Sequence, residues 1–167
     1  MNENHQTMLE SYLQVPDQLE TALAGLGEAN LDLTKGEGWS IRQVAHHIAT
    51  GQMMFAMCVK AILGLADVEL PFSWYMNLTQ DDWADIWAYD RRPLAPALAG
   101  LRGSILDLAD LLTHLPDEAW ERSGHITFRG QEQPTIIPIE WVIEMVPRHA
   151  NAHIQDDILA IRQLHGK

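Results

Sequence analysis

Two groups of histidines in this sequence have the spacing that a metal site requires. His46 and His47 are adjacent, and His149 and His153 are four residues apart. In an α-helix, residues four apart lie one turn above each other on one face, so His149 and His153 can approach one ion together. Zinc binds imidazole nitrogen at distances of about 2.0–2.1 Å. A third imidazole from a facing helix would complete a three-histidine site with an open coordination position.

The spacing is weak support for a metal site when it is taken alone. The chain has 8 histidines among 167 residues, and chance at this frequency gives roughly 0.4 pairs four apart. The alternative is a set of partly exposed, hydrogen-bonded histidines. His149 and His153 flank the apolar stripe of their helix, at the border of the core, where a ligand that substrate can reach should lie. His46 and His47 fall on opposite flanks of their stripe, and periodicity does not choose between them.

The elements that must position these histidines are almost all helical. Apolar residues recur at steps of three and four, as in helices of a bundle, and we expect little or no sheet. Pro16 should kink or restart the first helix, and Ser40 with Gln43 has the form of a capping box before the second. The four predicted long helices cover about residues 4–25, 41–64, 94–114 and 138–164.

The connections between these helices differ in length. Residues 65–78 are expected to form a loop, followed by a short helix that Thr79 and Asp82 could cap. This segment is long enough to cross over one end of the bundle, and the stretch from Trp120 to Pro134 is expected to be a polar loop. The predicted fold class is therefore all-α: a four-helix bundle in which residues 1–167 form a single domain, with a crossover before the third long helix.

The composition excludes several classes of partner. The chain has 23 acidic and 11 basic side chains and a formal net charge of −12, so we expect no nucleic acid and no anionic membrane as partner. No apolar run approaches the roughly 18 residues of a membrane-spanning helix, and we expect no signal peptide. Cys58 is the only cysteine, so no intrachain disulfide is possible, which fits a reducing, cytoplasmic location.

Two motifs resemble those of a known family. Residues 38–49, GWSIRQVAHHIA, resemble the GWS(I/V)R-x-V-x-HH-(L/V)-A signature of the DinB/YfiT-like superfamily, and residues 148–154, RHANAHI, resemble its C-terminal His-x-x-x-His helix. The middle of the chain also matches in order, and the resemblance spans nearly the whole sequence. It implies a four-helix bundle that holds a divalent metal with three histidines. The family's ligand directly precedes the Leu/Ile-Ala pair, so the resemblance implies His47, His149 and His153 as ligands.

Two positions depart from the family pattern. Many close members have another histidine four residues after the first ligand, where this chain has Gly51. Pro147 lies two residues before His149, and its ring must distort the helix. That distortion either aims His149 at the metal or damages the site.

Three neutral imidazoles would leave a dipositive ion without charge compensation from the protein. Such an ion lowers the pKa of a bound water toward about 7 or binds a thiol as thiolate, and we expect one of these to be the catalytic group. Zinc is the first choice of metal and nickel the second. The resemblance implies metal-dependent hydrolases and enzymes that use low-molecular-weight thiols such as bacillithiol or mycothiol, with a small-molecule substrate and a homodimer. The alternatives are a non-catalytic metal- or small-ligand-binding stress-response module, and a bundle with an empty site that acts through dimerisation.

Other polar and aromatic residues have both a structural and a functional interpretation. Glu144, Asp156 and Asp157 are close enough in sequence to orient a ligand imidazole, although such residues are more often solvated. Trp83 and Trp87 should pack the crossover, with pocket lining as the alternative. The histidines expected away from the metal are His125, which could reach the pocket from a loop, and His5, His114 and His165, which are expected at the surface.

Overall fold

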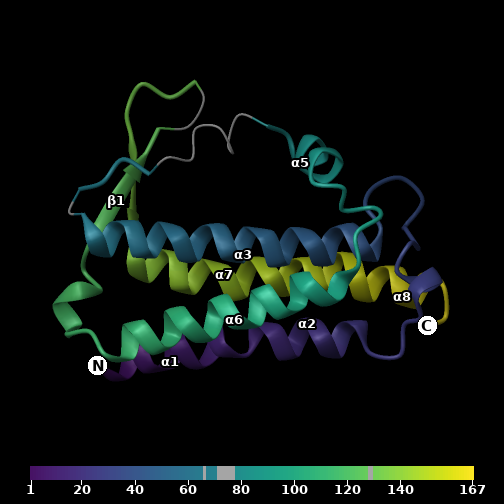
Figure 1. The fold of residues 1–167 in the computed structure, drawn as a ribbon, viewed down its shortest axis with the longest axis horizontal. Helices are drawn as coiled ribbons and strands as arrows, with labels where there is room; N and C mark the ends of the chain where they lie inside the picture. Colours follow the sequence, from purple (N-terminus) through teal and green to yellow (C-terminus); the bar gives the residue numbers. More distant parts are fainter. Residues whose placement is uncertain (66, 71–77, 128–129) are drawn as a thin grey trace.

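In the computed structural model, four lines of helix lie side by side along one long axis (Figure 1). The structure describes residues 1–65, 67–70, 78–127 and 130–167. The lines are α1 (Glu3–Leu13) with α2 (Val15–Leu23), α3 (Ile41–Gly64), α6 (Leu94–Thr113), and α7 (Ile139–His153) with the π-helical segment η3 (Ile154–Leu159) and α8 (Ala160–Leu164). The predicted all-α four-helix bundle is therefore confirmed. Within the described ranges, no helix has the length and apolar character needed to cross a membrane.

Local sequence sets where helices α2 and α3 begin. Pro16 lies in the first turn of α2, where its missing N–H has no intrahelical partner to lose, so the first line is restarted there as predicted. A short 3₁₀ turn, η1 (Glu28–Asn30), follows. At α3, the Gln43 N–H donates to the Ser40 hydroxyl and the Ser40 N–H donates to the Gln43 side chain at 2.9 Å. The predicted capping box therefore defines the start of the helix that carries His47.

Helix α3 lies at the centre of the packing, against both α6 and α7. Its contacts with α6 show that the two helices run in the same direction, because Met53 lies against Gly100 and Lys60 pairs with Asp107. Leu101, Ile105, Leu108 and Leu112 are fully buried on the side of α6 that faces the core. Parallel neighbours need a connection that returns along the bundle, which confirms the predicted crossover before α6.

The crossover carries a short helix, α5 (Gln80–Ile86), on the outer side of α3 (Figure 1). The Asp82 N–H donates to the Thr79 hydroxyl at 3.1 Å, and the Thr79 N–H donates to the Asp82 carboxylate at 2.8 Å. The predicted cap is thus present. The predicted loop over residues 65–78 falls partly outside the described residues, since 66 and 71–77 are not among them.

A β-hairpin occupies part of the stretch that was expected to be a polar loop. After the 3₁₀ turn η2 (Asp117–Ala119), strand β1 (Ser123–Ile126) pairs antiparallel with β2 (Thr135–Pro138), so the loop prediction was wrong for Ser123–Ile126, while β2 follows the predicted loop. The strands are too short for their alternation to stand out in the sequence. A Cβ at Gly124 would lie 2.9 Å from the Val68 carbonyl oxygen and 3.0 Å from Ile62, so the hairpin sits close against the C-terminal end of α3.

The fourth helix line contains an irregularity that the sequence did not reveal. Helix α7 continues through Pro147, and the wider π-helical turns of η3 begin directly after His153. His149 and His153 therefore lie between a proline and a π-helical segment, and such segments are frequent at functional sites.

One of the predicted surface histidines, His5, is instead buried. His5 is 3% exposed and stacks on Trp120 with ring centroids 4.2 Å apart. Its Nδ1 lies 3.2 Å from Asp117 and its Nε2 lies 2.8 Å from Glu140, so the first helix is tied to η2 and α7. The surface prediction failed because these partners come from distant parts of the chain. His114 and His165 are exposed as predicted.

Candidate metal centre

His47, His149 and His153 meet where α3 packs against the fourth helix line. Nε2 of His47 lies 3.3 Å from Nε2 of His149. The ring of His153 has its centroid 4.9 Å from that of His47 and 4.7 Å from that of His149, and one ligand atom from each residue lies within 4.8 Å of the others. Two nitrogens that share a tetrahedral zinc are about 3.3 Å apart when both bonds are 2.0–2.1 Å. The spacing of His47 and His149 is therefore that of ligands around one ion.

The environment keeps the imidazoles of His47 and His149 neutral. Burial lowers the pKa of His47 to about 3, and repulsion from His149 and His153 acts in the same direction. Burial together with His153 lowers the pKa of His149 to about 4. Neutral imidazoles offer a nitrogen lone pair, so protons do not compete with a metal at these two residues near neutral pH.

A carboxylate orients His153. Nδ1 of His153 lies 2.8 Å from Oδ2 of Asp157, which leaves Nε2 for a metal. Lys35 donates to Oδ1 of Asp157 at 2.7 Å and to the Asp156 carbonyl at 2.8 Å. Burial alone would raise the pKa of Asp157, but hydrogen bonds from Lys35 and His153 lower it. Of the three predicted orienting residues, Asp157 has this contact, Asp156 offers its backbone, and Glu144 is exposed beside α1.

Tryptophans cover the cluster from outside α3. The rings of Trp39 and His47 meet edge to face with centroids 5.1 Å apart. Trp83 of α5 lies roughly parallel to the His47 ring at 6.5 Å and to Trp87 at 6.4 Å. Trp83 therefore packs within the crossover, as predicted, and also covers a candidate ligand.

A hollow of about 300 Å³ opens beside His153. Its volume is at the lower end of the range for small-molecule sites. The residues that line it are Trp39, Val44, Gln80, Asp81, His153 and Asp157. The hollow therefore brings solvent-accessible space to one member of the histidine cluster, His153.

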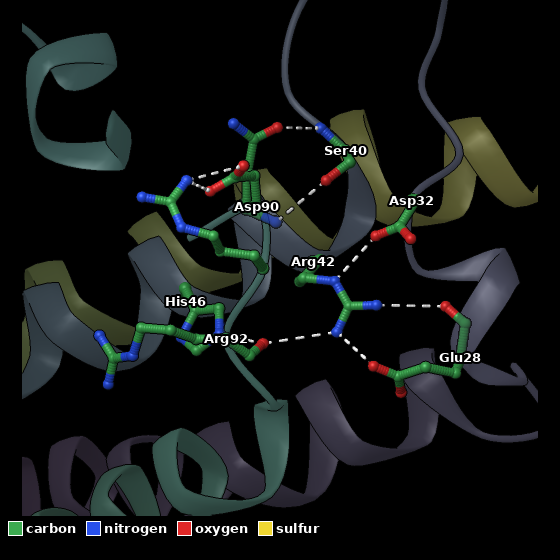
Figure 2. A network of polar contacts seen from close by, with 9 residues as sticks. Glu28, Asp32, Ser40, Arg42, His46, Asp90 and Arg92 are labelled. Atoms are coloured by element: carbon green, nitrogen blue, oxygen red, sulfur yellow. Dashed lines mark hydrogen bonds and ion pairs between the residues drawn. The ribbon is translucent and has the colours of Figure 1, made fainter. Parts of the chain in front are cut away.

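His46 faces away from the cluster, into a second network (Figure 2). It is fully buried, donates from Nε2 to the Arg92 carbonyl at 3.1 Å, and stacks on Tyr89. Periodicity left His46 and His47 as equal candidates, whereas the structure brings His47 to the cluster and assigns His46 to the crossover. The choice depends on what each flank of α3 contacts.

Arg42 organises the network in Figure 2. Its guanidinium donates to the carboxylates of Asp32 at 2.8 Å and Glu28 at 2.6 Å, and also to the carbonyls of Glu28 and Arg92. Hydrogen bonding to Asp32 raises the pKa of Arg42, so the group stays charged. Arg42 and His46 thus hold the same carbonyl and tie the end of the crossover to α3. A charged residue within an otherwise apolar helix was the signal that could have identified it.

Sequence comparison decides the family. The sequence model of the DinB superfamily matches residues 11–156. The chain belongs to the DinB superfamily. A protein of Geobacillus thermodenitrificans strain NG80-2 named "Putative metal-dependent hydrolase" is 27% identical to this DinB protein over 157 residues, which cover 92% of this chain and 81% of that one.

A solved structure supports the fold of this DinB protein. YfiT from Bacillus subtilis, described as a probable metal-dependent hydrolase with an unusual four-helix bundle topology, superposes with a TM-score of 0.82 at 20% identity. The match covers 99% of this chain and 90% of YfiT.

Three further positions discussed from the sequence of this DinB protein are His125, Gly51 and Pro147, and none of them disturbs the histidine cluster. His125 lies in β1, with Nδ1 3.3 Å from Asp67, at the C-terminal end of α3, whereas His47 lies near its start. His125 therefore does not reach the cluster. Gly51 lies one turn after His47, and a Cβ there would meet no atom within 4 Å. The missing family histidine thus leaves space on α3, and Pro147 does not prevent His149 from meeting His47.

Replacing Arg42 should destabilise the protein more than replacing an exposed arginine. Arg42→Lys keeps the charge but loses the planar fork that reaches several acceptors, and we expect the free energy of unfolding to fall by about 1–2 kcal/mol. Among the residues that the structure describes, Arg91 pairs only with its neighbour Asp90, and it is exposed, so Arg91→Lys should change the free energy of unfolding by less than about 0.5 kcal/mol. Urea denaturation of both variants measures the difference. Equal effects would show that the network does not anchor the crossover.

Acid should destabilise the metal-free protein. His47 and His149 have folded pKa values of about 3 and about 4, below the unfolded value of about 6.5. As the pH falls below about 6.5, the unfolded chain binds protons first, so the free energy of unfolding decreases by at most about 1.4 kcal/mol per histidine for each pH unit. Urea denaturation of chelator-treated protein at about pH 7 and about pH 5 tests this sign. His149→Gln should give a shallower decrease, and an unchanged slope would contradict the assignment.

Proposed function

We propose that this protein is a metal-dependent hydrolase whose divalent ion is held by His47, His149 and His153. The observation that carries the proposal is the 3.3 Å approach of two neutral imidazole nitrogens, from His47 and His149, with His153 alongside. Zinc is the first choice and nickel the second, because imidazole suits both. When bound, such an ion supplies a nucleophile at neutral pH, from a water of lowered pKa or from a thiol held as thiolate. The names of the relatives support the same chemistry.

The protein's own residues prepare this chemistry in three ways. Burial keeps His47 unprotonated, and Asp157 fixes the ring of His153 with its Nε2 free. Trp83 and Trp39 pack against His47 and reduce the access of bulk water to the site. The hollow beside His153 limits the substrate to a small molecule. The homodimer implied by the family resemblance stays a prediction.

The same site is also suited to transfer of a low-molecular-weight thiol. No carboxylate belongs to the three-histidine cluster among the described residues, so a bound dication would keep its full charge and favour thiolate over thiol. Hydrolysis and thiol transfer therefore share the metal site and differ in the nucleophile. Turnover with and without added thiol separates them.

The metal site predicts a stoichiometric ion in the purified protein. Elemental analysis should find about one zinc or nickel per chain in the wild type, because three imidazole ligands with an open position match a catalytic zinc site. His47→Ala should lose most of that metal, since two ligands remain. His114→Ala is the matched control, because His114 is exposed and far from the cluster in sequence. A wild type with well under one ion per chain would refute the proposal.

Turnover of model substrates tests the enzyme itself. Wild-type protein should hydrolyse an activated ester or amide, or combine a model electrophile with added thiol, and His149→Ala should abolish either activity while His114→Ala retains it. Protein that keeps its metal but turns over nothing would instead be the non-catalytic metal- or small-ligand-binding module.

The contact between Asp157 and His153 predicts an effect on metal affinity. Asp157→Asn keeps the size of the side chain but weakens the acceptor for His153 Nδ1, and we expect roughly 10- to 100-fold weaker zinc binding in competition with a chromogenic chelator. Asp156→Asn is the matched control, because the Asp156 side chain is exposed and Lys35 contacts only its carbonyl. Equal affinities for the two variants would show that Asp157 does not orient the ligand.

A further inference from the structure

The hollow beside His153 is lined by a carboxylate that a hydrogen bond holds in place. Asp81, in the first turn of α5, lines the hollow together with Trp39 and Gln80. The indole Nε1 of Trp39 donates to Oδ1 of Asp81 at 2.8 Å. That bond holds Oδ1, while Oδ2 has no protein partner in the described part of the chain. Asp81 is therefore held in place and still able to accept a hydrogen bond from a ligand.

The carboxylates at the hollow differ in whether other groups of the protein compensate or occupy them. Asp157 also lines it, but Lys35 compensates this carboxylate and His153 occupies its other oxygen. Asp82, the neighbour of Asp81, is used by Thr79 in the cap of α5. Within the residues that the structure describes, Asp81 has no cationic partner. It is the lining carboxylate whose charge remains available to a ligand.

Two further properties favour a cation at this wall. Trp39 offers an aromatic ring beside the carboxylate, and aromatic rings attract ammonium groups. The formal net charge of −12 draws cations toward the protein and repels anions. An anionic group would have to compete for Lys35, whose ammonium already has two acceptors.

We propose that this hollow selects a small molecule with an ammonium group near the group that binds the metal, and that Asp81 receives the ammonium. Trp39 acts as a positioning residue through its bond to Asp81. The inference rests on the proposed function, because it needs an ion at the three histidines. It goes further by defining the substrate class as amine-bearing.

Binding of matched thiols to the cobalt-loaded protein tests this inference without turnover. Cysteamine carries an ammonium, 2-mercaptoethanol is neutral and of similar size, and thioglycolate is an anion. The thiolate-to-cobalt charge-transfer absorption reports the affinity of each. We expect cysteamine to bind best, and Asp81→Asn to lower the ratio of cysteamine to 2-mercaptoethanol affinity by roughly fivefold, as for a partly exposed ion pair.

Two variants complete the test. Asp85→Asn is the matched control, since Asp85 is exposed on the same helix but does not line the hollow, and it should leave the ratio unchanged. Trp39→Phe keeps an aromatic ring but removes the donor to Asp81, and it should lower the ratio by a smaller factor. The cobalt absorption without thiol shows whether each variant keeps its metal site.

The outcomes separate the two proposals. Cobalt that is not retained would refute the proposed function. If cobalt is retained, three results would overturn the ammonium site while leaving metal binding intact. They are an affinity ratio that Asp81→Asn leaves unchanged, a preference for thioglycolate, and no thiolate-to-cobalt absorption with any thiol.

Discussion

The structure depends on the close packing of three imidazoles between α3 and the fourth helix line, of which burial keeps His47 and His149 neutral. Charged imidazoles packed this closely would repel one another in a medium of low dielectric constant, and burial opposes their protonation for the same reason. His47 and His149 can approach to 3.3 Å only because both stay neutral. One ligand atom from each of the three histidines then lies within 4.8 Å of the others, an arrangement that a divalent ion stabilises.

Helix α3 connects this site to the rest of the fold. One flank presents His47 to α7, and the other presents His46 and Arg42 to the carbonyl of Arg92 at the end of the crossover. Because α3 carries both His47 and the side chains that bond to the crossover, the segment that carries Trp83 is tied to the helix that carries His47. The tryptophan that covers the site and His47 are therefore both positioned by α3, while α7 positions His149 and His153.

Two carboxylates near the cluster differ because of their partners. Asp157 contacts His153 and is neutralised by Lys35, so it acts on the orientation of a ligand. Asp81 is held by a neutral indole N–H, so the ammonium site that we propose is centred on it. The two carboxylates that line the hollow therefore differ in charge compensation: Lys35 pairs with Asp157, and no cation among the described residues pairs with Asp81.

The helices and the histidine pair four residues apart followed from the sequence, because helical periodicity and caps such as Ser40 with Gln43 are local properties. Family resemblance added the choice of His47. The hairpin, the π-helical turns after His153, the burial of His5 and the bonds of Arg42 did not follow. Each of these depends on partners far away in the chain or on the packing of one helix against another. Local sequence specifies which face a side chain occupies, whereas tertiary packing decides what that face meets.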